Sequence, residues 1–155
     1  MERAESKLKF VGLHAHSVAG SPFDALGYPS DHMDFAYENG MDAMALTDHG
    51  NMNGFSWQLL HAKKMNKEGR TFKPLFGCEA YYIKDVEEWQ EAFDAANEKK
   101  KKEKAKGVNM EASEGKNRVR TYNHLLLIAQ NQKGLNNLFK LVSTSHEDKY
   151  FYRKP

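Results

Sequence analysis

The sequence predicts an α/β fold in which short strands alternate with helices, and three observations support this. Short apolar runs end near positions 16, 47 and 83, and helical spacing of apolar residues follows the first two. The connections are short, which is typical of parallel strands in a sheet or barrel. The chain has 155 residues, enough for one domain with a sizeable core.

The first half of the chain is expected to form three strands and two helices. The predicted strands cover residues 9–16, 42–47 and 73–83. A helix is predicted to begin after Ser30 as its N-cap, with Asp31 in its first turn, and to end at Gly40. A second helix is predicted over 55–67, and Gly69 should end it.

Order is expected to resume near Tyr122, after a polar stretch. A strongly apolar strand is predicted over 125–129 and a helix over 135–145. The expected total is four strands and at least three helices. Four β-α units cannot close a barrel, so either the sheet is open or the chain is a piece of a larger domain.

Residues 84–120 interrupt the alternation as a charged insertion. Residues 85–98 contain six acids and no base, and residues 99–106 contain six lysines and one glutamate. These two parts are predicted to form one long helix with a weak apolar face, and the rest to be a mobile loop. The lysines could contact phosphates, or they could belong to a solvated helix face or a disordered insertion.

Composition excludes several classes of protein. The net charge is +2, so the chain as a whole is not a strongly basic nucleic-acid binder. Cys78 is the one cysteine, which rules out an internal disulfide and fits a reducing cytoplasm; a buried, non-catalytic role is expected for it. Residues 1–9 lack the apolar core of a signal peptide, and no apolar run has the length of a membrane span.

Ligand-type side chains lie near the ends of the first three predicted strands. His14 and His16 are two residues apart, so on a strand they would point to the same face. His49 and Glu79 follow or end the next two strands, and the carboxyl ends of parallel strands meet at one edge. Imidazole and carboxylate together suit zinc, manganese or iron. A single His-x-His is more often not a pair of metal ligands. The presence of His49 and Glu79 at the ends of the next two strands favours a metal site here.

Several motifs in this order resemble a known family. They are Leu13-His14-Ala15-His16-Ser17 and the stretches 45–52, 74–81 and 123–129. The sequence there resembles the polymerase and histidinol phosphatase (PHP) domain, most closely the version at the N-terminus of bacterial DNA polymerase III alpha subunits. The stretches 134–143 and 150–155 also resemble that subunit, so the resemblance runs from about residue 10 to 155, apart from 84–120.

The resemblance implies a fold and a set of functions. Residues 1–155 would be the N-terminal portion of a distorted barrel of seven β-α units that holds up to three divalent metal ions. The family acts as a phosphoesterase, and in some polymerases as a 3′–5′ exonuclease that proofreads. In others it is an inactive platform for a separate exonuclease subunit. The implied partners are the rest of the polymerase chain and DNA, and the implied location is the cytoplasm.

The resemblance also implies roles for single residues. The implied metal ligands are His14, His16, Asp24, His49, Glu79 and His124, of which His14, His16 and Glu79 would also be catalytic. Asp48 is expected to accept a hydrogen bond from a ligand histidine. From its own position His124 indicates only a capping or surface histidine, because it precedes its apolar run.

Three functions remain open at this point. The first is a metal-dependent phosphoesterase or exonuclease module of a polymerase, favoured by the ligand-type residues. The second is a structural or partner-binding module, favoured because the family's downstream cysteine and Asp-x-His ligands have no counterpart in these residues. The third is a small-molecule phosphatase such as a histidinol phosphatase.

Overall fold

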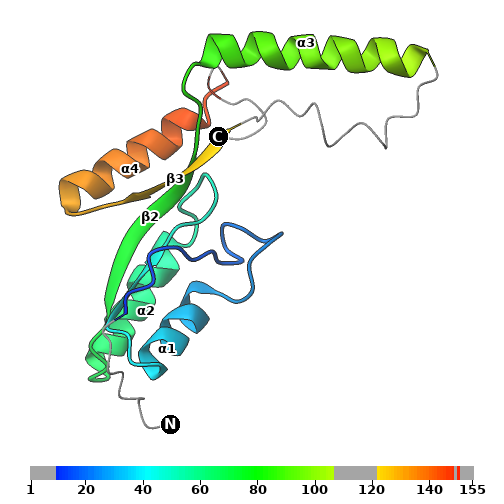
Figure 1. The fold of residues 1–155 in the computed structure, drawn as a ribbon. Helices are drawn as coiled ribbons and strands as arrows, with labels where there is room; N and C mark the ends of the chain where they lie inside the picture. The colour runs from blue at the N-terminus through cyan, green and yellow to red at the C-terminus, as the bar shows by residue number, and fades with distance from the viewer. Residues whose placement is uncertain (1–9, 107–121, 149, 151–155) are drawn as a thin grey trace. The chain divides into compact units, whose positions relative to one another are not determined.

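A computed structural model describes residues 10–106, 122–148 and 150 (Figure 1). Its elements in chain order are α1 (Pro29–Glu38), β1 (Ala43–Leu46), α2 (Phe55–Lys67), β2 (Lys73–Tyr82), α3 (Val86–Ala105), β3 (Asn123–Ile128) and α4 (Gln132–Ser145). The chain divides into two compact units, residues 1–80 with 125–155 and residues 81–124. The α/β class is confirmed; the sevenfold barrel stays a prediction. The rest of the predicted insertion, 107–120, lies outside the described residues.

The three strands form one sheet in the order β1-β2-β3. β1 and β2 are parallel, with Ala43 opposite Lys73 and Leu46 opposite Phe76. β3 runs the other way along β2, so the sheet is mixed and the expectation of parallel strands throughout is wrong for β3 (Figure 1). The predicted insertion separates β2 from β3 along the chain, and an antiparallel pair does not need the crossover connection that a parallel pair needs.

Residues 10–16, predicted as a strand, run beside β1 but are joined to it by one bridge, between Gly12 and Met44. Ala45 N donates to Gly12 O at 2.7 Å, and Thr47 N donates to Ala15 O at 2.8 Å. The acceptors are three residues apart while the donors are two apart, so the register slips by one residue, as at a β-bulge. The slip explains why no regular ladder forms.

The start of α1 differs from the expected N-cap. Tyr28 occupies the cap position, and Pro29 is the first helical residue, where its missing N–H costs nothing. Tyr28 N donates to Asp31 Oδ2 at 2.7 Å, so Asp31 stabilises the first turn as expected. Ser30 was the wrong cap because proline fixes a helical φ one position earlier.

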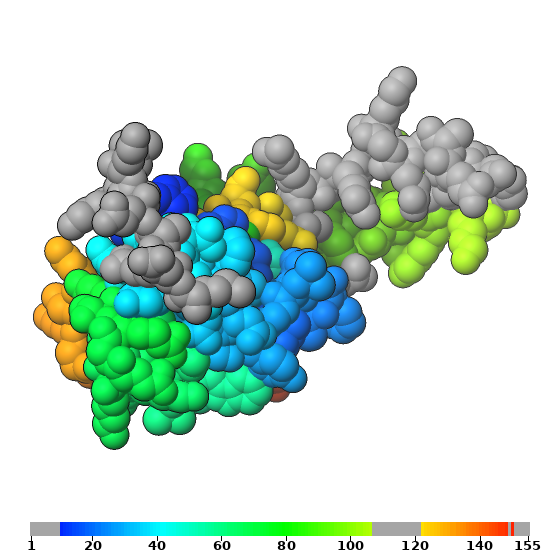
Figure 2. Space-filling model, turned by 90° about the horizontal axis from the view of Figure 1, so that it is seen from below, coloured from blue at the N-terminus to red at the C-terminus, as the bar shows by residue number. Residues whose placement is uncertain are grey.

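The core of the first unit lies where α1 and α2 meet β1. Its buried residues are Met33, Ala36, Met44, Ala62, Met65 and Phe72. Figure 2 shows the surface of this region from below, with α1 in blue to cyan beside the green end of α2. The apolar faces that the sequence predicted for both helices therefore cover the start of the sheet.

An ionic cluster joins the two helices at their surface. Asp34 Oδ1 in α1 accepts from Arg70 Nη1 at 2.6 Å and lies 3.0 Å from His61 Nε2 in α2. Partial burial alone would raise the pKa of Asp34, but the contacts with His61 and Arg70 outweigh it and lower that pKa. The cluster fixes α1 against α2.

The first part of the charged segment forms one long helix, α3. Asp85 caps it, accepting from Glu88 N at 3.0 Å, and none of its residues is fully buried. α4 begins after Asn131, whose side chain accepts from Gly134 N at 3.0 Å. No described helix combines the length and apolar character of a membrane span.

Candidate metal centre

Backbone pairing holds His49 and Glu79 side by side. Gly50 N donates to Glu79 O at 2.8 Å, and Glu79 N donates to Asp48 O at 3.0 Å, which makes a parallel bridge between positions 49 and 79. Glu79 lies in β2 and is 1% exposed, whereas His49 follows the end of β1. The sequence prediction that these two residues meet at one edge is confirmed.

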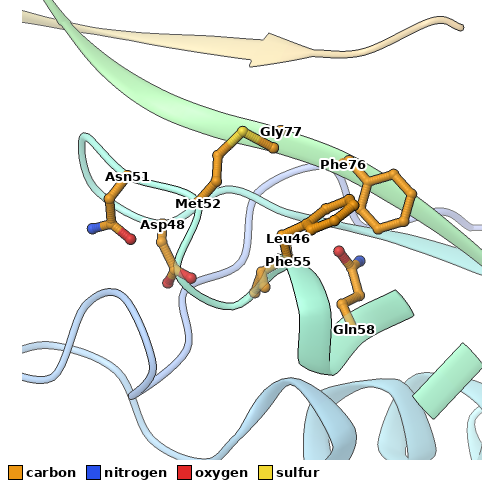
Figure 3. Close-up of a pocket in the computed structure, with 8 residues that line it drawn as sticks. All are labelled: Leu46, Asp48, Asn51, Met52, Phe55, Gln58, Phe76 and Gly77. Carbon is orange, nitrogen blue, oxygen red and sulfur yellow. The ribbon is translucent and has the colours of Figure 1, made fainter. Parts of the chain in front are cut away.

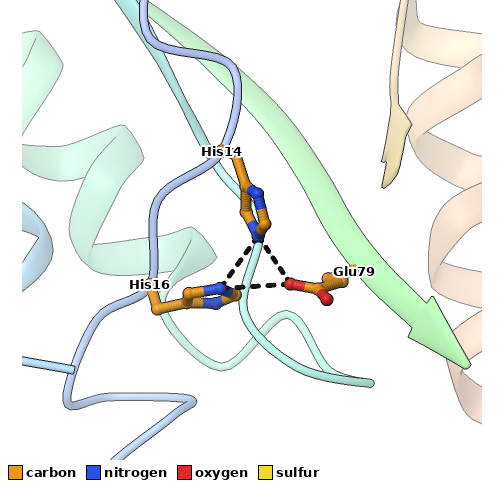
Figure 4. Close-up of side chains that lie close together, drawn as sticks. All are labelled: His14, His16 and Glu79. Carbon is orange, nitrogen blue, oxygen red and sulfur yellow. Dashed lines mark hydrogen bonds and ion pairs between the residues drawn. The ribbon is translucent and has the colours of Figure 1, made fainter. Parts of the chain in front are cut away.

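His14 and His16 converge on the carboxylate of Glu79 (Figure 4). Nε2 of His14 lies 2.6 Å, and Nε2 of His16 3.1 Å, from Oε2 of Glu79. The two Nε2 atoms are 3.0 Å apart, and the rings meet edge to face. Two positions of one extended segment therefore aim at one point, as the spacing predicted.

Protons cannot satisfy all three contacts of this triangle. An ionised carboxylate only accepts, and each imidazole Nε2 either donates one hydrogen or offers a lone pair. If both Nε2 atoms donate to Glu79, their two hydrogens oppose each other. If one Nε2 does not donate, its lone pair opposes the lone pairs of the carboxylate. A cation that accepts all three lone pairs removes this conflict, so the donor set of His14, His16 and Glu79 fits a metal ion.

His49 and Asp24 extend the cluster. Nδ1 of His49 is 3.5 Å from Oε2 of Glu79, and its Nε2 is 2.6 Å from Oδ2 of Asp24. The ring of His49 stacks on that of His16 with centroids 4.1 Å apart. Burial, and next the charge of His49, lower the pKa of His16, which favours the neutral ring that a metal ligand needs.

Asp48 does not touch a ligand histidine, which corrects the expected contact. Its buried carboxylate accepts from Ser17 N at 2.7 Å, Ser17 Oγ at 3.0 Å and Ser21 Oγ at 3.0 Å. Ser21 Oγ in turn accepts from His49 N at 3.1 Å. Asp48 therefore fixes the loop that carries Asp24, and Ser21 links its carboxylate to His49 N.

Small residues make room for this carboxylate. A Cβ on Gly20 would lie 2.6 Å from Cβ of Asp48, and one on Gly54 would lie 2.5 Å from Cδ2 of Leu46. Figure 3 shows Asp48 in the small pocket beside Leu46 and Asn51. Ser17 and Ser21 were not identified from the sequence as positioning residues. The polar residues of the loop after His16 were the available signal.

His124 belongs to the second unit and is described within it. It lies at the start of β3 and is exposed. Its ring lies against Tyr81, with centroids 5.4 Å apart, and stacks against Tyr122, with centroids 5.7 Å apart. Its role as a ligand stays a prediction.

Cys78 is 2% exposed, and burial raises its pKa to about 11, with a smaller contribution from Asp48. The expectation of a buried cysteine is confirmed. A thiol that stays protonated at neutral pH is a poor nucleophile.

The fold and this cluster define an α/β protein with a candidate metal centre of histidine and carboxylate ligands near the ends of its strands. A family model described as the PHP domain matches residues 12–155, so the chain belongs to the PHP domain family. The resemblance stated from the sequence motifs is confirmed.

Curated relatives include replicative polymerase chains. The chain is 31% identical over 145 residues to DNA polymerase III subunit alpha of Chlamydia pneumoniae, covering 94% of this chain and 9% of that protein. It is 40% identical over 83 residues to DNA polymerase III PolC-type of Thermotoga maritima, covering 54% of this chain and 6% of that protein. The chain thus spans about a tenth or less of these relatives.

A solved structure is also similar in part. It is a two-domain protein of Bacteroides vulgatus described as containing a predicted PHP-like metal-dependent phosphoesterase. The sequence identity is 22% and the TM-score 0.43, with 54% of this chain and 28% of that chain covered.

Proposed function

We propose that this chain is a metal-dependent phosphoesterase module of a DNA polymerase III alpha-type chain, acting on the 3′ end of DNA. The observation that carries the proposal is the convergence of two imidazole nitrogens and one buried carboxylate oxygen on a single point. In this proposal the ligands are His14, His16, Glu79, His49 and Asp24, with His124 as a sixth. Zinc, manganese or iron would suit these donors.

The chemistry follows from the donor set. A bound cation would lower the pKa of a water molecule and neutralise charge on a phosphate ester. Glu79 has two carboxylate oxygens, so it could serve two neighbouring cations at once. Asp24 is half exposed and 2.6 Å from His49, so it stands where solvent and a substrate phosphate could reach it.

The proposed substrate and partners rest on the relatives. Both are polymerase chains by name, which favours a DNA phosphodiester over a small phosphomonoester such as histidinol phosphate. The rest of such a polymerase chain would be the covalent partner, and DNA the substrate. A separate exonuclease subunit would be a partner if the module serves as a platform.

One observation favours that second function, a structural or partner-binding module without catalysis. Among the described residues of the first unit, three side chains meet at the tightest point, and His14 is 50% exposed there. Three protein ligands with an open position are also the pattern of catalytic zinc sites, so only the exposure of His14 favours the structural module.

Metal content and hydrolysis separate the two functions. The purified chain is loaded with zinc or manganese, dialysed and analysed for bound metal, then incubated with a 3′-labelled single strand and with a phosphomonoester. The variant His14→Ala/His49→Ala is compared with His146→Ala, which removes a histidine at the end of α4. Metal and DNA hydrolysis, both lost only in the double variant, support the phosphoesterase.

Other results decide against it. Metal binding without hydrolysis of either substrate supports the structural module. Hydrolysis of the phosphomonoester alone would indicate a small-molecule phosphatase. No bound metal in the parent chain contradicts the proposed centre.

A further inference from the structure

Charge is divided sharply along α3. Its first part, from the Asp85 cap to Glu98, contains six acids and no base. The part from Lys99 to Lys106 contains six lysines and one glutamate, which leaves five positive charges. This order agrees with the helix macrodipole, because acids stand near the N-terminus and bases near the C-terminus. One helix therefore presents two surfaces of opposite sign.

The positive surface is open to solvent. The six lysines, Lys99, Lys100, Lys101, Lys102, Lys104 and Lys106, are all exposed. Lys101 Nζ lies 3.2 Å from Glu98 Oε1, and both side chains are largely exposed. Within the part of the chain that the structure describes, Lys99, Lys102, Lys104 and Lys106 form no ion pair with a carboxylate. These four charges are thus not neutralised by a carboxylate of the described residues.

We propose that this lysine surface, residues 99–106 at the C-terminal end of α3, binds the phosphate backbone of duplex DNA. Seven helical rises from Lys99 to Lys106 span roughly 10 Å. Duplex DNA carries one charge per about 1.7 Å of its axis, or about six charges over that length. On a helix Lys99, Lys102 and Lys106 share one face, so about three of the positive charges can meet the phosphates of one duplex. The proposal goes beyond the phosphoesterase function and does not depend on a bound metal.

The composition of the surface sets the mode of binding. It contains lysine rather than arginine and no aromatic residue, so it offers point charges without bidentate base contacts or stacking. We therefore expect binding that is independent of base sequence and steeply weakened by salt. The acidic first part of α3 would repel DNA and confine the contact to the C-terminal part.

The test measures binding of a fluorescent duplex of mixed sequence by anisotropy, in EDTA, across a series of salt concentrations. The variant replaces Lys99, Lys100, Lys102 and Lys106 by glutamine, which keeps good helix propensity. A matched control replaces the exposed Lys63, Lys64, Lys67 and Lys73 by glutamine and changes the net charge equally. A second variant with arginine at the four α3 positions keeps the charge.

The expected result is specific to α3. At about 50 mM salt the α3 glutamine variant should bind at least about tenfold more weakly, with a salt slope reduced by roughly two to four, whereas the control and the arginine variant change less than about threefold. Equal losses in the α3 variant and the control would overturn the proposal. So would a parent chain that binds anionic lipid vesicles or an acidic peptide but not the duplex. Because EDTA removes metal, failure of this test is distinct from failure of the phosphoesterase.

Discussion

Nε2 of His14 lies 2.6 Å from Oε2 of Glu79, although 65 positions separate the two residues in the chain. The carboxylate is buried, and three imidazoles lie within 3.5 Å of the same oxygen. A buried carboxylate is costly unless cations or strong donors surround it. The negative charge of Glu79 should therefore matter more to this centre than that of any exposed acid.

Replacing Glu79 by glutamine should abolish most metal binding with little change of shape. The amide keeps the size of the side chain but loses the charge and one acceptor oxygen. Loss of a supporting residue commonly weakens metal affinity by about 10- to 100-fold, and loss of a ligand should cost at least as much. Titration with zinc, followed by calorimetry, measures this. Glu38→Gln, an exposed change in α1, should leave affinity unchanged, and equal binding in both variants would contradict the assigned ligand.

Replacing Ser21 by alanine should lower both the stability of the fold and the metal affinity, although Ser21 is not itself a proposed metal ligand. The hydroxyl donates to Asp48 Oδ1 and accepts from His49 N, so its loss removes two hydrogen bonds, while Asp48 Oδ1 keeps the one from Ser17 N. A destabilisation of about 1–3 kcal/mol is expected in denaturant unfolding. Metal affinity should also fall, because His49 is held less firmly. Ser30→Ala, at a serine whose hydroxyl bonds to no described residue, should cost less than about 0.5 kcal/mol.

Replacing Gly77 by alanine should destabilise the sheet. An added Cβ would lie 2.7 Å from Leu127 O and 2.9 Å from Thr47 Cγ2, closer than atoms normally approach. Overpacking of this kind costs about 1–3 kcal/mol, measured as a lower melting temperature. Gly12→Ala is the matched change, since no atom of a described residue lies within 4 Å of its added Cβ. A similar loss in both variants would show that the contact with β3 is not the cause.

The ionic cluster at Asp34 should make stability depend on pH. Its pKa is lower in the folded state than in the unfolded state, so its contribution is complete above the unfolded pKa and is lost as the pH falls through the folded one. Asp34→Asn should cost on the order of 1 kcal/mol or less at about pH 7, since the carboxylate is more than a third exposed. Unfolding in urea at about pH 7 and about pH 3 tests this, because the difference should shrink in acid.

A double-mutant cycle supplies the control for this cluster. Arg70→Gln should produce a similar loss, and the double variant should lose less than the sum of the two. Simple additivity would mean that Asp34 and Arg70 do not stabilise each other.

Local patterns predicted much of the fold. The α2 helix has the predicted bounds, because helical spacing and Gly69 both mark it. The cap of α1 was misplaced by two residues, since Pro29 outweighs the preference of Ser30. The direction of β3 could not be predicted, because the alternation of elements does not distinguish a crossover from a return through an insertion.

The site likewise has parts that local sequence patterns predict and parts that they do not. The pairing of His14 with His16 follows from strand periodicity, and the meeting of His49 with Glu79 follows from parallel pairing. The bonds of Ser21 to Asp48 and His49 join residues 27 and 28 positions apart and have no periodic signature. Only a folded chain shows that the hydroxyl stands between them.

The bridge between His49 and Glu79 divides the centre into two halves that are held by different bonds. Glu79 lies in β2, which pairs with β1, and two backbone hydrogen bonds join it to the residues on either side of His49, so we expect these two residues to move together. The other half contains His14, His16 and Asp24. Its segment is joined to β1 by backbone hydrogen bonds with a slip in register, and to Asp48 by the hydroxyl groups of Ser17 and Ser21. We expect a bound cation to leave when residues 10–24 move away from the sheet. Its release rate would then report how often this movement occurs.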